Sequence, residues 1–477
     1  MLNELLHESP DACLTDPDAC LAHVRQVRDS YKLLDRERIG AERILELKFA
    51  TLYWRRNLLS LLCGDPPPSW IGPDHNTLID IVDALGIRLP KALVASLSRH
   101  VDRKTVHELL ARQGVPSREY PEFKAMAGPG IDLDISANRD SSWPFTRWKR
   151  QPEFANYELS GDAVVFRGLH FLPGDVLLAN VNIDGNGIYT VLSDPARFSS
   201  HSGVFVVLED DGGRYPAVIE TYEKGVRAIP LNVFLGAKFC AYVEIVRHRD
   251  LNGAYAGAIN RSAVDMMNRV HGYNFNSIEL DRHYVSCCTV GSLLHRDAGL
   301  EPASWKSRIQ DARIRENIAK LGYTFYDFFS PVDYLLDRNF TCAGWVDNHQ
   351  FEDLLARELV EGYFRELFMT RALNPGRFPL KCRLNHWGIR QIRRRSLIGR
   401  IIASVEGFDH LSLPKGPDPL LAVITVVEAQ LGRVIKRTRA WLKTYDNWPD
   451  YFSLAEFSRR PEVRAFLQSE LKLRWLE

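Results

Sequence analysis

Two adjacent cysteines, Cys287 and Cys288, stand between small hydroxyl residues in the stretch YVSCCTVGSLL, residues 284–294. At this point a loop-like segment gives way to an apolar helical pattern, so one thiol falls in the first helical turn. The dipole and unpaired N–H groups of a helix N-terminus favour negative charge, and the thiolate is the nucleophilic form of cysteine. We therefore consider a cysteine nucleophile, with a buried core cysteine as the alternative.

A thiol nucleophile needs a base that takes its proton and a polar group that orients the base. His201 lies in FSSHSGVFVV, at the mouth of a predicted strand, and Glu220 lies in PAVIETYE, near or within the next strand. Neighbouring antiparallel strands can place such side chains next to each other. Glu223 competes with Glu220 for the orienting role. A structural histidine and a solvated glutamate are the alternative interpretations.

Other polar residues near these segments receive different interpretations. Tyr284 could donate a hydrogen bond to an oxyanion, although we expect it to pack, and the backbone N–H of the nucleophile is the alternative donor. Asp175, in Pro-Gly-Asp, is expected to cap a turn. His295 follows the cysteines by about two helical turns and is expected to point elsewhere. The remaining nearby histidines are His170, His271 and His283.

The eight cysteines do not form a metal-binding or disulfide pattern. Their spacing is irregular, with neither CxxC nor HExxH, and the chain of 477 residues is too long and cysteine-poor for a disulfide scaffold. Asp132 and Asp134 lie in a segment rich in Gly, Pro and Ser, and we expect a solvated turn there. We therefore predict no metal and no cofactor.

The elements that would position the candidate residues follow from periodicity. Residues 1–120 carry apolar residues at three- and four-residue spacing, which predicts helices, and residues 121–160 are typical of a loop. Residues 163–247 contain short segments rich in Val, Ile and aromatics, which predict strands. Helical patterns return after residue 247. The fold class expected is α+β, with an antiparallel sheet packed on helices.

The ordered series of motifs resembles the circularly permuted papain-like hydrolases related to NlpC, the YiiX/YebB and lecithin:retinol acyltransferase-like group. This resemblance implies that His201 is the general base, that Glu220 orients it, and that the nucleophile comes last in the chain. Cys287 is favoured over Cys288, because Val290 then stands at the apolar position three residues on. The motifs are GDVLL (174–178), SHSGVFV (200–206), VIE (218–220), GVRAIPL (225–231), YNFN (273–276) and SCCTV (286–290).

Two features depart from the pattern of that group. The helix start has Thr289 where the group has Glu, and residues 182–198 intervene between the first strand and His201. A later segment, residues 329–345, is similar to the Pro-Asp-containing tail of the same domain. The expected domains are a helical N-terminal domain (1–150), a permuted papain-like catalytic domain (151–345) and a helical C-terminal domain (346–477).

The resemblance implies a thiol-dependent hydrolase that cleaves an amide or peptide bond through an acyl-cysteine intermediate with a Cys-His-Glu triad. Two alternatives stay open. One is an acyltransferase that passes the acyl group to an amine or a lipid hydroxyl, and the other is an inactive scaffold that binds a partner.

Charge and hydropathy exclude some partners. The chain has 61 Lys and Arg against 60 Asp and Glu, so no basic field indicates nucleic acid. We find no signal peptide and no run of about 18 apolar residues, which predicts a cytoplasmic protein, with signal-independent export left open. The segment HWGIRQIRRRSLIGRII contains Arg393, Arg394 and Arg395. We expect a solvated helix face there, with an anionic membrane or an acidic partner as the alternative contact.

Overall fold

The structure is a computed structural model of the whole chain. It describes all residues except 9, 65–66, 72–74, 88–103, 105, 107–157, 167, 182–190, 193–199, 211–212, 223–224, 237–239, 271, 275–281, 305–306, 325, 349–350, 406–416 and 477.

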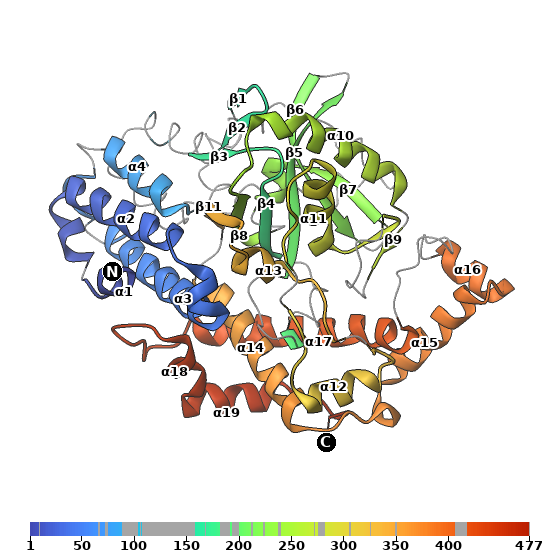
Figure 1. Cartoon of the computed structure of the whole chain (residues 1–477). Coiled ribbons are helices and arrows are strands. Elements are labelled where there is room, and N and C mark those ends of the chain that lie inside the picture. Colours follow the sequence, from blue (N-terminus) through green and yellow to red (C-terminus); the bar gives the residue numbers. More distant parts are fainter. Residues whose placement is uncertain are drawn as a thin grey trace.

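A helical layer forms the N-terminal part of the chain, as its apolar spacing predicts (Figure 1). Asp16 and Asp35 cap the helices that follow them, because each side chain accepts a hydrogen bond from a backbone N–H of the first turn. The elements are α1 (Leu2–His7), the 3-10 helix η1 (Pro10–Leu14), α2 (Pro17–Lys32), α3 (Arg36–Leu62) and α4 (His75–Leu85).

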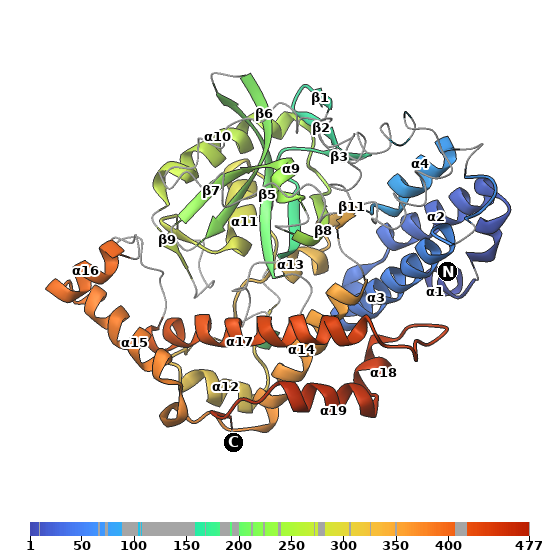
Figure 2. The same ribbon diagram turned by 180° about the vertical axis from the view of Figure 1, so that it is seen from behind.

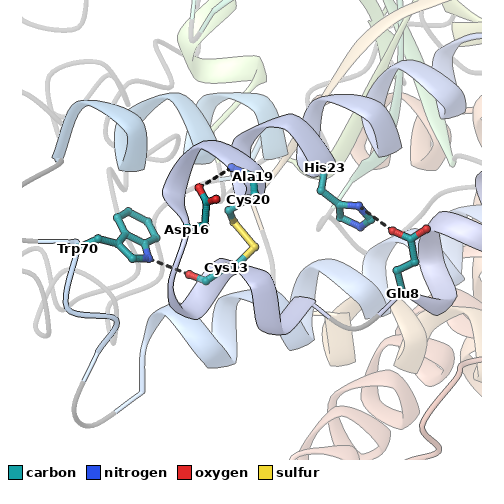
Figure 3. Close-up of a disulfide and its surroundings, with 7 residues drawn as sticks. All are labelled: Glu8, Cys13, Asp16, Ala19, Cys20, His23 and Trp70. Carbon is teal, nitrogen blue, oxygen red and sulfur yellow. Dashed lines mark hydrogen bonds and ion pairs between the residues drawn. A yellow bond between two sulfur atoms is a disulfide. The ribbon is translucent and has the colours of Figure 1, made fainter.

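One disulfide, between Cys13 and Cys20, joins η1 to the first turn of α2 (Figure 3). The indole of Trp70 donates a hydrogen bond to the Cys13 carbonyl at 2.8 Å, so the disulfide lies in a packed environment. No sequence pattern predicted this disulfide. Disulfides persist mainly in oxidising compartments, so the cytoplasmic location stays a prediction.

The centre of the molecule is a six-stranded antiparallel sheet in the order β11-β8-β4-β5-β6-β7. Residues of β5 alternate between its two faces. Val204 and Val206 pack with two helices, whereas Phe205 and Val207 face the opposite core. The strands are β4 (Val176–Val181), β5 (His201–Asp210), β6 (Gly213–Tyr222), β7 (Gly225–Pro230), β8 (Cys240–His248) and β11 (Phe340–Asp347).

Both faces of the sheet are covered, which explains why its strands have nearly continuous apolar sequences. On one face lie α10 (Gly253–Arg269) and α11 (Cys287–Asp297), as Figure 1 shows. On the other face lie a small antiparallel sheet and the short helix α9 (Leu231–Phe234). The strands of that small sheet are β1 (Glu158–Ser160), β2 (Ala163–Phe166) and β3 (Leu169–Phe171).

The C-terminal part is helical and lies along one side of the sheet and its helices (Figure 2). Arg357 in α14 donates a hydrogen bond to the Ser200 hydroxyl at 3.3 Å, next to the start of β5. The elements that follow α11 are α12 (Ala312–Ala319), α13 (Pro331–Leu336), α14 (Phe351–Thr370), the 3-10 helix η4 (Pro375–Arg377), α15 (Leu380–Arg393), α16 (Leu397–Val405), α17 (Asp418–Leu442), α18 (Leu454–Arg459) and α19 (Pro461–Glu470).

The N-terminal helices are joined to the sheet by buried charges. Arg36 pairs with Glu244 of β8 at 2.6 Å, and Arg55 of α3 lies 3.5 Å from Asp347 of β11. Breaking a buried pair by removing one partner typically costs about 3–5 kcal/mol, so these contacts tie the helical layer to the sheet.

The α+β class with an antiparallel sheet is confirmed, whereas the permuted papain-like arrangement and the three domain boundaries stay predictions. Within the described ranges, none of the helices combines the length and the apolar character that crossing a membrane requires.

Candidate active site

The cysteine pair lies at the N-terminus of α11, with Cys287 as the first helical residue. The backbone N–H of Ser286 donates a hydrogen bond to Thr289 Oγ1 at 3.0 Å. Thr289 therefore supplies the reciprocal contact of a capping box at the start of α11. The first four N–H groups of a helix have no partner within the helix, and that of Cys287 is among them.

The start of α11 is fixed to its neighbours by hydrogen bonds to its carbonyl groups. The hydroxyl of Ser202 in β5 donates to the Cys287 carbonyl at 2.9 Å, and that of Tyr334 in α13 donates to the Cys288 carbonyl at 2.8 Å. A Cβ at Gly291 would lie 2.5 Å from the Tyr334 hydroxyl oxygen, so this close approach requires glycine. The backbone of the two cysteines is thus fixed to β5 and α13.

The structure brings His201 and Glu220 together. His201 begins β5 and Glu220 lies on β6, where it pairs with Gly203 in the register. His201 Nε2 lies 2.7 Å from Glu220 Oε2, and both side chains are buried. Arg227, opposite Glu220 on β7, forms an ion pair with the other carboxylate oxygen. The carboxylate is therefore held between an imidazole and a guanidinium.

The imidazole also hydrogen-bonds the sulfur of Cys287. Because Nε2 is engaged by Glu220, Nδ1 is the ring nitrogen left for this contact. Burial acts to lower the pKa of His201, but the hydrogen bonds and charges of Cys287 and Glu220 outweigh it and raise the pKa to about 10. For Glu220, burial acts to raise the pKa, whereas Arg227 and His201 lower it below its ordinary value.

The two thiols differ in acidity. A hydrogen bond from Cys288, whose sulfur lies 3.7 Å away, lowers the pKa of Cys287; burial opposes this, and His201 lowers the pKa further, to well below its ordinary value. Burial and the neighbouring Cys287 raise the pKa of Cys288 well above its ordinary value. These directions favour a Cys287 thiolate beside a His201 imidazolium, with the Cys288 thiol protonated.

A tyrosine hydroxyl completes the surroundings of the sulfur. Tyr273 Oη lies 3.5 Å from Cys287 Sγ. Burial and the Cys287 charge raise the pKa of Tyr273 well above its ordinary value, so the hydroxyl keeps its proton. Tyr273 belongs to β9 (Gly272–Tyr273), which pairs in parallel with β10 (Tyr284–Val285). The hydroxyl beside the thiol is thus that of Tyr273 rather than that of Tyr284.

Several residues that the sequence analysis considered lie away from this contact or outside the described residues. His295 Nε2 donates to the Gly174 carbonyl at 2.7 Å, and exposed His283 has Nδ1 3.4 Å from the Arg269 carbonyl. Asp175 accepts from the Leu172 N–H within its turn and pairs with Arg247. His170 is an exposed residue of β3. Asp132, Asp134, Glu223 and His271 lie outside the described residues.

Sequence reasoning assigned no role to Tyr273 or Arg227. Both lie in stretches that carry the resemblance, YNFN and GVRAIPL, but neither stretch reveals which side chain turns toward the site. Among the residues that the structure describes, no group of three His, Cys, Asp or Glu side chains is placed to hold a metal ion. Comparison of the chain with family models, curated proteins and solved structures finds no match.

Proposed function

We propose that this protein is a thiol-dependent hydrolase that cleaves an amide or peptide bond through an acyl-Cys287 intermediate. The observation that carries the proposal is the contact of Cys287, at a helix N-terminus, with an imidazole whose other nitrogen bonds Glu220. Nucleophile, base and orienting group then stand in the relation that thiol catalysis requires. The sequence resemblance to permuted papain-like hydrolases supports the same assignment.

In the first step the Cys287 thiolate attacks the carbonyl carbon of the substrate and forms a C–S bond, while the carbonyl oxygen takes up the electron pair as an oxyanion. The C–N bond then breaks, and the leaving nitrogen receives the proton that the His201 imidazolium holds. The amine departs, and the acyl group remains on the sulfur as a thioester.

In the second step neutral His201 removes a proton from water, and the resulting oxygen nucleophile attacks the thioester carbon. The C–S bond breaks, the carboxylic acid leaves, and the thiolate–imidazolium pair is restored. Glu220 keeps its charge throughout and stabilises the imidazolium, and Arg227 holds that carboxylate in position. We assign oxyanion binding to the Cys287 N–H and the Tyr273 hydroxyl, which remains protonated.

An acyltransferase would share the first step, with an amine or a hydroxyl in place of water in the second. An inactive scaffold would carry out neither step. Trapping the intermediate distinguishes these alternatives, because the acyl group attached to the protein and the acceptor that removes it are then identified separately.

The experiment exposes the full chain to a panel of activated acyl esters and follows the protein by intact mass spectrometry. We expect an added acyl mass in the wild type and in Cys288→Ala, and none in Cys287→Ala. His201→Ala should accumulate the adduct at least about 100-fold more slowly, because base catalysis and thiolate formation are lost together. Release of the adduct by water supports the hydrolase, and release that requires an added amine or alcohol supports the transferase. An adduct that persists in Cys287→Ala would overturn the assignment.

A further inference from the structure

The helices α15 and α16 form an arm in which α15 packs on α17 and α16 extends away from the rest of the molecule (Figures 1 and 2). Apolar side chains of this arm are left uncovered. Six of the twelve exposed large hydrophobic side chains of the described residues belong to it. They are Leu380, Leu384, Trp387, Leu397, Ile398 and Ile401, with exposed fractions between 48% and 75%. Such clustering is unusual, since exposed hydrophobic residues normally occur singly.

The corner between the two helices has a defined geometry. Arg395 adopts a positive φ of 51°, which ends α15, and the Ser396 hydroxyl accepts a hydrogen bond from the Gly399 N–H at 3.0 Å. A Cβ at Gly399 would collide with the backbone of Gln391, so α16 crosses α15 at close range. Ile392 and Ala403 are each 7% exposed. The arm therefore buries part of its own apolar surface and leaves the six side chains outward.

Along the chain, the charge of the arm is of one sign. Residues 367–405 contain nine Lys and Arg and no Asp or Glu. Arg393, the last residue of α15, pairs with Asp418, the first residue of α17, at 2.8 Å. The other exposed cationic residues of the arm are Lys381, Arg383, Arg390, Arg394, Arg395 and Arg400. The surface therefore combines uncovered Leu, Ile and Trp side chains with a dense positive charge.

We propose that this arm docks on an anionic lipid bilayer. The guanidinium groups would bind lipid phosphates, and the six apolar side chains would enter the boundary between headgroups and acyl chains. Trp387 suits that depth, because its ring is apolar and its N–H is polar. A nucleic acid satisfies the positive charge but offers no apolar surface for Leu384 or Ile401. The inference is independent of the proposed thiol chemistry.

The test measures flotation of the full chain with phosphatidylcholine vesicles, with and without about 30% phosphatidylglycerol. We expect binding to the anionic vesicles only, and a loss of several-fold on going from low salt to about 0.5 M salt, where charge is screened. Replacing Leu384, Trp387 and Ile401 together by Glu should lower the bound fraction at least about 10-fold. Replacing the same three residues by Ser should also lower the bound fraction. This variant tests whether the loss in the Glu variant arises from misfolding.

Matched controls use exposed residues outside the arm. Leu33→Glu changes a side chain that is 79% exposed and should leave vesicle binding unchanged. Replacing Arg394, Arg395 and Arg400 by Glu should abolish binding, whereas replacing Arg459, Lys472 and Arg474 by Glu should reduce it by less than about threefold. Cys287→Ala should bind as the wild type does, which separates this result from any failure of the proposed activity.

Three outcomes would overturn the inference. The first is no binding of the wild type to anionic vesicles at low salt. The second is equal binding by the wild type and the arm variants. The third is that the wild type does not bind vesicles but self-associates, or binds a nucleic acid or an acidic protein, and that the arm variants lose this association. Each of these would show that the arm does not dock on an anionic bilayer.

Discussion

Two buried imidazoles lie near opposite ends of α11, and they differ in charge. His201, beside the N-terminus of the helix, contacts the Cys287 thiol and the Glu220 carboxylate, and its pKa is raised to about 10. His295, in the last turn, is buried and bonds the Gly174 carbonyl; burial, together with the nearby His248, outweighs this hydrogen bond and lowers its pKa from 6.5 to about 4.

The comparison separates burial from ion pairing. Burial acts to lower the pKa of both rings, but a carboxylate and a thiol offset it at His201, and a neutral carbonyl does not do so at His295. The neutral ring fits a packing role, and the charged ring fits a catalytic one. The pKa values therefore make His201, and not the histidine on α11 itself, the base candidate.

Removing each of the two thiols in turn should have the largest effect on the reactivity of the site. Cys287→Ala is expected to abolish labelling by iodoacetamide at pH 6, a loss of at least about 100-fold, because a thiol with an ordinary pKa is almost wholly protonated there. Cys288→Ala should lose less, because it removes the hydrogen bond that lowers the Cys287 pKa most but leaves the His201 hydrogen bond and charge, which lower it as well. Labelling rates at fixed pH provide the measurement, and equal losses in the two variants would contradict the assignment.

Glu220→Gln should lower the pKa of His201 toward the low pKa of His295. The amide keeps the shape of the side chain but removes the charge that helps to raise the His201 pKa. We expect the Cys287 labelling rate at pH 6 to fall by about 10-fold or more, since each pKa unit corresponds to about a factor of ten. Glu209→Gln, an exposed change on β5, is the matched control. Unchanged labelling in Glu220→Gln would show that the carboxylate does not support the imidazolium.

His295 should affect stability and leave the thiol unaffected. Its folded pKa of about 4 lies below the ordinary value of 6.5, so its contribution to stability is present above pH 6.5 and is lost as the pH falls toward 4. His295→Gln should make the free energy of unfolding, followed by urea denaturation, less steep in this pH range. At pH 7 the variant should be less stable by about 1–3 kcal/mol.

The labelling rate of Cys287 in His295→Gln is the internal control for that experiment, and it should stay within about twofold of the wild type. A large loss of labelling with no change in stability would reverse the roles given to the two histidines.

The sequence was informative where local patterns determine structure. Short segments rich in Val, Ile and aromatic residues predicted the strands that carry His201 and Glu220, and the expectation that these strands are antiparallel neighbours made the contact of the two side chains a reasonable expectation. The change from a loop to an apolar pattern also predicted a helix start near Cys287, where α11 begins.

The rest depends on contacts that no local pattern encodes. Tyr273 reaches the sulfur because two short strands, β9 and β10, pair in parallel, which involves residues about twelve apart in the chain. The Cys13–Cys20 disulfide was not predicted, because the spacing of these cysteines matches no common motif. The Arg-rich segment was predicted to be a helix face in solvent; only the tertiary arrangement reveals that Leu384 and Ile401 are left uncovered as well.

The central claim is that the Cys287 sulfur is a thiolate at neutral pH because the His201 imidazole has taken up the thiol proton. The most direct test is the pH dependence of the rate of Cys287 alkylation in the wild type and in His201→Ala. The account predicts a titration midpoint far below the ordinary thiol value of 9.0 in the wild type, and one near or above that value in the variant. Midpoints near 9.0 in both proteins would contradict it.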